Sequence, residues 1–368
     1  MKYGVYADIN NSVPSSMSST GRTCLLYLGN CPAPDSDIHY ITSWADAQSY
    51  LNIRPQTDVI VGDACFVCLD MIKIPFYAVR TLPQSEFIEE VCQNVADFVA
   101  STDYDSYIIC IVRMKIGEIT TFWGRLGELI TKPVFYIGDY SENPLDRETQ
   151  YVLENGRPDI EKLLEVAGTL PQDSRHELSF GAFKHPNRAY PVALSALRAA
   201  LLAQNDVIYK SPVRVDGNIV FEAESLQAKR FDPTSYIPLL MTKADADTLA
   251  ENCINTAVQI NGQFRTWGDM TTDGTFINVA RMGDFLTNWF NNHYLNKTPL
   301  TLCDRDTIIR DVSAYLDSLI ALGALSYGSI EWVEHSGVWQ FDLALVNPRP
   351  TRALTAQVRH GDIVINYL

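Results

Sequence analysis

Apolar and polar positions follow recognisable periods along most of this chain. Continuous apolar runs typical of buried strands lie at 23–29, 74–80, 104–112 and 133–137. Between these runs, apolar residues recur at helical spacing and predict helices at 43–50, 58–71, 84–100 and 118–130. Strands that alternate with helices favour a mostly parallel sheet with helices on its faces.

The second half of the chain continues with mixed signals. Helices are predicted at 159–167, 191–204 and 244–254, and an extended, turn-rich passage at 230–240. A glycine-punctuated extended segment follows at 260–268, and residues 276–282 lead into a helix. A long helix is predicted from Asp304, as N-cap, to about Leu322, with a stop at Gly323. Its apolar stripe consists of Ile308, Val312, Tyr315, Leu319 and Leu322.

Both ends of the chain are alternating apolar segments that need a partner strand. At the start, Tyr3, Val5, Ala7 and Ile9 share one face of a predicted strand, which a Ser-rich stretch separates from the rest. Residues 338–345 form a strand, a Pro-Arg-Pro break follows, and 357–367 contain one or two strands. The tail carries Ile363, Val364, Ile365 and Tyr367. The two ends either pair within their own subunit or add strands to neighbouring subunits.

These patterns together predict an α/β fold, α+β overall. The expected organisation is an N-terminal arm and linker at 1–21, an α/β domain with a mostly parallel sheet at 22–252, a smaller α+β C-terminal domain at 253–355, and a C-terminal arm at 356–368. Composition agrees, because 46% hydrophobic and 20% charged residues are ordinary for a globular protein.

Charge and targeting signals limit the environment. A net charge of −15 argues against direct nucleic-acid binding, which needs clustered Lys and Arg. No apolar run approaches the length of a membrane span, so membrane insertion is not expected, and no signal peptide precedes the first strand. We therefore expect the protein to be made and kept in a cytoplasm.

A search for catalytic or ligand-binding motifs finds none. The sequence lacks a dinucleotide-binding glycine motif after a strand, a Walker lysine and a nucleophile elbow. The six histidines have no ligand spacing, and Cys65 and Cys68 are half of a zinc pattern without the second half. The eight cysteines lie in apolar stretches and are expected to be buried free thiols. We expect no cofactor, no metal and no enzymatic activity.

Several segments, taken in order, resemble the contractile phage tail sheath family. The opening resembles that family in Leu28-Gly29-Asn30-Cys31-Pro32-Ala33-Pro34 and Ile41-Thr42-Ser43-Trp44-Ala45-Asp46, and the family's Arg-containing strand is matched by residues 74–80. The C-terminal third resembles the family through the extended segment that ends in Trp267-Gly268, the helix with Arg281-Met282-Gly283-Asp284, and the helix end Gly323-Ala324-Leu325.

This resemblance implies a structural subunit of a contractile tail sheath, of the short form found in R-type pyocins and other contractile injection systems. In such particles, hexameric rings stack helically around an inner tail tube and contract to drive the tube through the host envelope. Expected partners are further copies of the chain, the tail tube protein, and the baseplate and tail terminator proteins. The expected location is the virion tail, assembled in the host bacterial cytoplasm.

The resemblance also implies which surfaces make contacts. The terminal arms would complete small sheets in neighbouring subunits, and helices of the C-terminal domain would face the tube. The candidate tube contacts are Arg281, Asp284, Arg305, Asp306, Arg310 and Asp311. Met270 stands where the family often has a basic residue, which is a departure from the family pattern. Two alternatives stay open: a cytoplasmic α/β enzyme of unknown reaction, or a non-contractile virion scaffold component.

Overall fold

The computed structural model describes most of the chain. The described residues are 23–33, 35–55, 61–81, 85–141, 153–154, 157–183, 185, 188, 190–204, 241–260, 263–290, 302–321, 324–335, 338–346, 354–359 and 362–367. The predicted N-terminal strand, the Ser-rich linker and the extended passage at 230–240 lie outside these residues.

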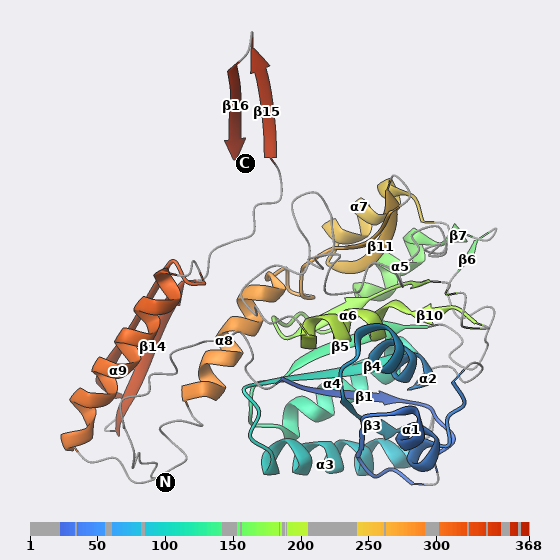
Figure 1. Ribbon diagram of the computed structural model, residues 1–368, viewed down its shortest axis with the longest axis horizontal. Helices are drawn as coiled ribbons and strands as arrows, with labels where there is room; N and C mark the ends of the chain where they lie inside the picture. Colours follow the sequence, from blue (N-terminus) through green and yellow to red (C-terminus); the bar gives the residue numbers. More distant parts are fainter. Residues whose placement is uncertain are drawn as a thin grey trace.

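An eight-stranded sheet in the order β12-β11-β8-β5-β4-β1-β3-β2 is the centre of the described structure (Figure 1). Its strands are β1 Thr23–Gly29, β2 His39–Ile41, β3 Phe76–Arg80, β4 Ser106–Met114, β5 Phe135–Tyr140, β8 His176–Ser179, β11 Ile254–Ile260 and β12 Gln263–Trp267. All neighbouring pairs are parallel except the two edge pairs, β2 with β3 and β11 with β12. The predicted α/β class with a mostly parallel sheet is confirmed.

Helices cover both faces of this sheet and enclose two cores. On one face lie α1 Trp44–Leu51, α2 Val61–Cys65, the π-helix η1 Phe66–Ile72 and α6 Leu194–Gln204. On the other lie α3 Ser85–Ser101, α4 Ile116–Leu129, α5 Ile160–Ala167 and α7 Lys243–Glu251. Alternate residues of β4 divide between the cores: Ile108, Cys110 and Val112 face the first, while Tyr107 and Ile109 face the second. This alternation is what a strand buried on both faces requires.

Side-chain caps explain where several of the predicted helices begin. Ser43 accepts a hydrogen bond from the backbone N–H of Asp46 at the start of α1, and Asp159 accepts one from Lys162 at the start of α5. Thr242 and Asp245 form a reciprocal capping box at the start of α7. Each cap satisfies N–H groups that have no partner inside the helix, so the helix start is set locally.

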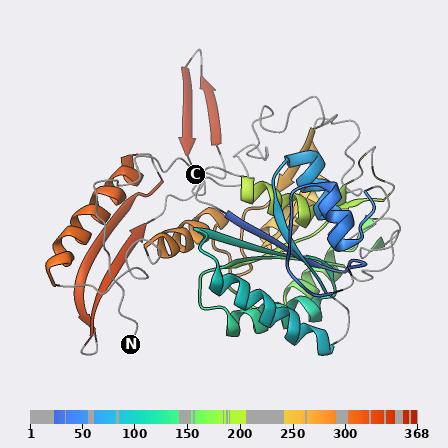
Figure 2. The same cartoon turned by 60° about the horizontal axis from the view of Figure 1, so that its bottom comes forward.

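The remaining described elements form small sheets and a separate helical layer. The helices are α8 Ile277–Phe290 and α9 Leu302–Ala321, and the two-stranded sheets are β6 Leu153–Glu154 with β7 Arg157–Pro158, β9 Ala182–Phe183 with β10 Val192–Ala193, β13 Tyr327–His335 with β14 Val338–Val346, and β15 Leu354–Arg359 with β16 Asp362–Tyr367. We call α9, β13 and β14 the C-terminal unit. Figure 2 shows it beside the α/β domain, with α8 between them.

Three predicted elements differ from the structure. The helix predicted at 58–71 is α2 followed by the π-helix η1 within the described residues 61–72. The helix predicted at 244–254 ends at Glu251, because Ile254 already begins β11. The helix predicted to begin after an Asp304 cap begins at Leu302, so Asp304 lies in its first turn.

The sheet includes strands from beyond the predicted domain boundary. Both β11 and β12 follow residue 252, yet β11 pairs in parallel with β8 through Ile254–Leu178 and Asn255–Ser179. Neither β8 nor β11 is predicted from the sequence. A boundary at 252 and 253 therefore falls between α7 and a strand of the same sheet.

Candidate functional site

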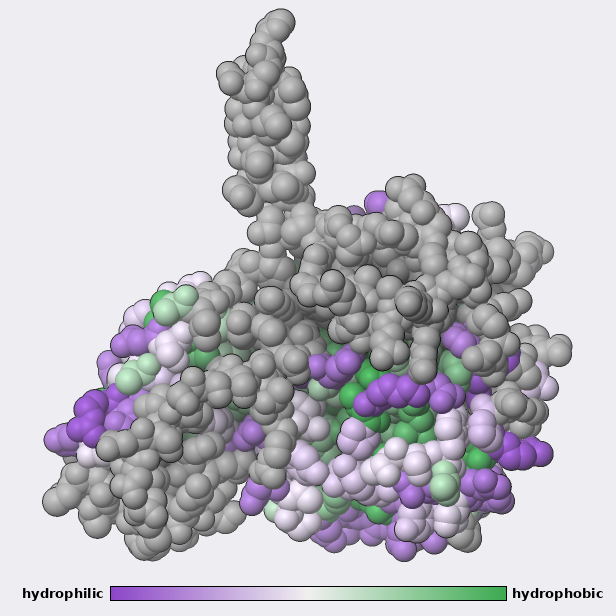
Figure 3. Space-filling view, in the orientation of Figure 1, coloured by the Kyte–Doolittle hydropathy of each residue, from purple (hydrophilic) through white to green (hydrophobic). Residues whose placement is uncertain are grey.

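The surface of the described residues is mostly polar. Among these residues, the large hydrophobic side chains that are clearly exposed are Tyr40, Tyr50 and Tyr327. Figure 3 shows hydrophilic and intermediate side chains over most of the coloured surface, with hydrophobic side chains near the middle of the α/β domain and smaller hydrophobic areas on the C-terminal unit. No described helix has the combination of length and apolar character that crossing a bilayer demands.

The predicted C-terminal arm is a β-hairpin. In β16, Ile363 pairs with Val358 of β15, Ile365 with Ala356, and Tyr367 with Leu354; Val364 pairs with Gln357. This hairpin forms its own two-stranded sheet and stands clear of the other drawn elements in Figure 1. An isolated two-stranded hairpin is marginally stable in water, so a partner surface would stabilise it. The N-terminal residues Tyr3, Val5, Ala7 and Ile9 lie outside the described residues.

Four of the six predicted tube contacts lie on α9. Its apolar stripe of Ile308, Val312, Tyr315 and Leu319 is buried, as predicted. On the rest of the helix, Arg305 pairs with Asp306 at 2.8 Å and Arg310 with Asp311 at 3.2 Å. The side chains of Asp306 and Arg310 are 76% and 70% exposed, so they are available to another protein.

The other two predicted contacts, Arg281 and Asp284, lie on α8 and face the α/β domain instead of solvent. Arg281 is only 2% exposed. Burial lowers the pKa of its guanidinium to about 10, although Glu177 and Asp284 act in the opposite direction. Asp284 forms an ion pair with Arg175 at 3.0 Å. Burial raises the pKa of the Asp284 carboxyl to about 6, against the opposing effect of Arg175.

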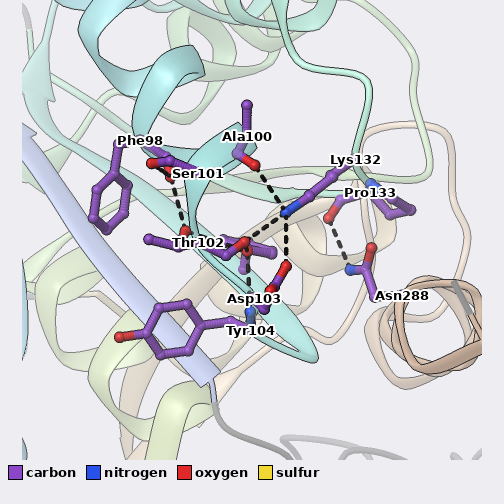
Figure 4. A network of polar contacts seen from close by, with 10 residues as sticks. Phe98, Ala100, Ser101, Thr102, Asp103, Tyr104, Lys132, Pro133 and Asn288 are labelled. Atoms are coloured by element: carbon purple, nitrogen blue, oxygen red, sulfur yellow. Dashed lines mark hydrogen bonds and ion pairs between the residues drawn. The ribbon is translucent and has the colours of Figure 1, made fainter. Parts of the chain in front are cut away.

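Further contacts join α8 to the α/β domain. The side-chain amide of Asn288 donates to the backbone carbonyl of Pro133 at 3.3 Å. The neighbouring Lys132 donates to the carbonyl of Thr102 and lies 3.6 Å from Asp103 at the end of α3 (Figure 4). The segment between α4 and β5 is therefore tied both to α3 and to α8.

A second buried polar group lies under α6 at the ends of the central strands. Asp63 of α2 pairs with Arg113 at 2.8 Å and with Arg188 at 2.9 Å, and it also accepts from the backbone N–H of Ala193. Arg113 reaches Asp63 from a β-bulge in β4, where its own φ is +51°. Because both arginines are buried, these contacts fix α2 and residue 188 to the sheet.

Two more buried carboxylates complete this layer. Glu177 of β8 accepts from Arg198 of α6, and Arg198 also donates to the carbonyl of Gly268 at 3.3 Å. Asp139 of β5 is fully buried, and burial raises the pKa of its carboxyl to about 8, although Arg113 opposes the rise. None of these residues is predicted from the sequence. The sequence feature that points to such residues is a charged residue at the end of an apolar strand, as at Asp139.

The chemistry of these groups favours a structural role. Within the described ranges, no cluster of three or more His, Cys, Asp or Glu has the arrangement of a metal site. The cysteines described are all free, and burial raises the pKa of thiols such as Cys24, Cys68 and Cys92 to about 12. A thiol with so high a pKa is almost entirely protonated at neutral pH and is a poor nucleophile.

The overall fold is shared with chains of contractile injection systems. A chain in the six-fold symmetrised baseplate structure of the anti-feeding prophage matches with a TM-score of 0.66 and 14% identity, covering 98% of this chain and 99% of that one. A chain in the contracted PVC sheath complex, an extracellular contractile injection system, matches at 0.63 and 14%, covering 97% of both. A sheath tail protein of Listeria innocua matches at 0.54 and 9%, covering 90% of this chain and 97% of that one.

Sequence comparison adds nothing to this likeness. No protein-family model matches the chain, and no curated protein is significantly similar to it. The chain has the fold of contractile tail sheath proteins. At sequence identities of 9–14%, this likeness is one of structure alone.

Proposed function

We propose that this chain is a structural subunit of a contractile tail sheath. It polymerises as stacked hexameric rings around an inner tail tube, and the sheath contracts to drive the tube through a host cell envelope. One observation carries the proposal: the similarity to injection-system chains covers nearly the whole length of both partners. If unrelated proteins shared only one common domain, the similarity would cover that domain alone and would not run from the first described strand to the C-terminal unit.

The same role fits the buried charge layer and the absence of recognised catalytic motifs. Rigid ion pairs such as Asp63 with Arg113 hold the helices of the α/β domain in register, which suits a subunit that moves as a body. Under this proposal the location is a tail particle, and the partners are other copies, the tube, the baseplate and the tail terminator. Under the same proposal its role is structural and not enzymatic.

Purified protein should show the proposed assembly directly in negative-stain electron microscopy. Long striated cylinders of uniform diameter are the expected result, alone or on co-expressed tube. Discrete small oligomers that persist at high protein concentration and with tube present would contradict the proposal and favour the enzyme or scaffold alternatives.

The terminal arms are proposed to link neighbouring subunits. The hairpin β15–β16 and the strand at 3–9 would each add to a sheet of an adjacent copy, through main-chain hydrogen bonds worth about 0.5–1.5 kcal/mol each. The open edges of the β13–β14 sheet are suitable acceptors, because in the described residues that sheet has only two strands.

Truncation tests this linkage. Deleting residues 1–10 or 360–368 should leave a folded, soluble subunit that no longer polymerises, as judged by circular dichroism and sedimentation. Ile365→Pro should act in the same way, because proline removes a main-chain donor from the strand, whereas Ile365→Val is the matched control that keeps the strand. Sheaths that still form from both truncations would remove the arm-exchange mechanism.

The tube-binding surface is proposed to be the charged face of α9, with Arg305, Asp306, Arg310 and Asp311. Charged contacts of this kind weaken with salt over a Debye length of about 10 Å at 0.1 M. Arg310→Glu should reduce co-sedimentation of sheath with tube and flatten its salt dependence. Lys243→Glu on α7 is the control, because it reverses a side chain that is 56% exposed on another part of the subunit. If both variants bind the tube equally well, this face of α9 does not form the tube-binding surface.

A further inference from the structure

Five polar side chains converge between helix α6 and strands β5 and β8. Register places Asp139 of β5 beside Ser179 of β8, and Glu177 lies two residues before Ser179, so these three share one face of the sheet. That face meets α6, because Glu177 accepts a hydrogen bond from Arg198 of this helix. Ser195 precedes Arg198 by three residues and lies on the same side of α6. We call these five side chains the polar site.

The polar site is closed off from bulk solvent. Its five residues are only 0–2% exposed. The apolar core that α6 shares with the sheet surrounds it, with Cys110 and Ile137 on the strands and Leu197 on the helix. A polar group in such surroundings has given up its hydrogen bonds to bulk water, so it needs partners inside the protein.

Six atoms of the polar site have no hydrogen-bond partner among the described residues. They are both carboxyl oxygens of Asp139, Oε2 of Glu177, the hydroxyl oxygens of Ser179 and Ser195, and Nη1 of Arg198. Burial raises the pKa of Asp139, and Arg113 and the nearby Ser195 hydroxyl oppose the rise. The hydroxyl and the carboxyl nevertheless form no hydrogen bond of normal geometry. Unpaired buried polar atoms are costly, so six in one place call for a partner.

Water has the hydrogen-bonding capacity that these atoms require. Oε2 of Glu177 needs a donor and Nη1 of Arg198 needs an acceptor, and a water molecule is both. The Glu177–Arg198 ion pair uses Oε1 of the glutamate, and a buried pair is favourable only when its remaining lone pairs and protons are bonded too. Ser179 and Ser195 have the smallest hydroxyl side chains, which leaves space for a small molecule between helix and sheet. Within the described ranges, no cluster of three or more His, Cys, Asp or Glu suits a metal ion instead.

We propose that the polar site is an internal hydration site that binds about two water molecules. A buried water makes about three hydrogen bonds, so two of them match the six unpaired atoms. These waters bridge β5, β8 and α6, and they complete the hydrogen bonding of the buried Glu177–Arg198 pair. The site belongs to the single subunit, so it holds whether or not the chain forms a sheath.

The direct test is a crystal structure of the full chain at a resolution that shows ordered water. We expect at least one density peak within about 2.6–3.2 Å of the Ser195 hydroxyl and of either Asp139 or Glu177. A map in which the six atoms bond directly to one another, with no such peak, would overturn the proposal. The oligomeric state of the crystallised protein does not affect this result, so it is separate from the test of the sheath function.

Water relaxation supplies an independent measurement in solution. Oxygen-17 magnetic relaxation dispersion of the unassembled subunit reports water molecules that stay inside the protein while it tumbles. Ser195→Val replaces the hydroxyl by a larger apolar group that occupies the site, so the dispersion amplitude should fall by the contribution of about two waters. Ser179→Val on β8 should have the same effect, and it serves if the first variant fails to fold, because valine suits a strand.

Ser318→Val on α9 is the matched control, because Ser318 is exposed and its hydroxyl donates to the carbonyl of Tyr315 in its own helix. The dispersion amplitude of this variant should equal that of the unmodified chain. If Ser195→Val and Ser179→Val fold and leave the amplitude unchanged as well, the polar site holds no long-lived water and the proposal is wrong.

Discussion

The buried carboxyl of Asp139 makes subunit stability depend on pH in an unusual direction. Its folded-state pKa is raised to about 8 by burial, above the ordinary value near 4 that it has in the unfolded chain. The folded state therefore keeps a proton that the unfolded state releases between these two values. A group of this kind stabilises the fold at low pH, and the contribution is lost as pH rises toward 8.

The size of the effect follows from that single proton. Between pH 5 and pH 7, the folded Asp139 is protonated and the unfolded one is ionised, so the free energy of unfolding falls by about 1.4 kcal/mol per pH unit. The loss over this window is about 2.7 kcal/mol. Since domains are stable by only roughly 5–15 kcal/mol, a change of this size is readily measured.

Asp139→Asn isolates the contribution. Urea unfolding of the unassembled subunit at pH 5 and pH 7 gives the free energy for each protein, and the amide has no proton to release. The variant should gain about 2.7 kcal/mol relative to the unmodified chain between the two values. His176, whose pKa burial lowers to about 4, and Asp284 titrate in both proteins and cancel. Asp317→Asn, at an exposed position of α9, is the control. A difference that does not change with pH would refute the reasoning.

Three further outcomes are expected. Trp289→Ala should destabilise the C-terminal unit by about 3–5 kcal/mol in urea unfolding, because it opens a cavity beside Tyr315; an unchanged midpoint would contradict the packing. Gly268→Ala should cost about 1–2 kcal/mol or more, since φ is +94° there and a Cβ would clash with Asn255; wild-type stability would show the strain to be absent. Cys65 and Cys68 should be reduced, and a mass loss of two hydrogens under non-reducing denaturation would disprove this.

Elements with a strong local pattern were predictable. Residues 23–29 form β1 with the predicted limits. Seven consecutive residues suited to a buried strand are enough to define such a strand locally. Helix α4 and the buried stripe of α9 follow from spacing alone. Gly268 was picked out by its place after Trp267, and its positive φ supplies the physical reason.

Elements that depend on distant partners were not predictable. Strand β8 has the sequence His-Glu-Leu-Ser, with a single aliphatic residue, and it is stable in the sheet because Arg198 of α6 neutralises Glu177. Arg281 was a candidate tube contact, but its side chain is buried. A helical pattern gives the spacing of a polar face and does not tell whether that face meets water or a second domain. Only tertiary structure supplies that information.

The parallel pairing of β8 with β11 has a consequence for synthesis of the protein. Ser179 leaves the ribosome long before Ile254, and at roughly 5–20 residues per second the gap lasts on the order of 4–15 s. During that time the nascent sheet ends in β8, whose free edge is a template for pairing with other chains. The segment from 254 to 267 thus closes the sheet late and protects it. Slower translation across the intervening residues would lengthen the exposure and increase aggregation on the ribosome.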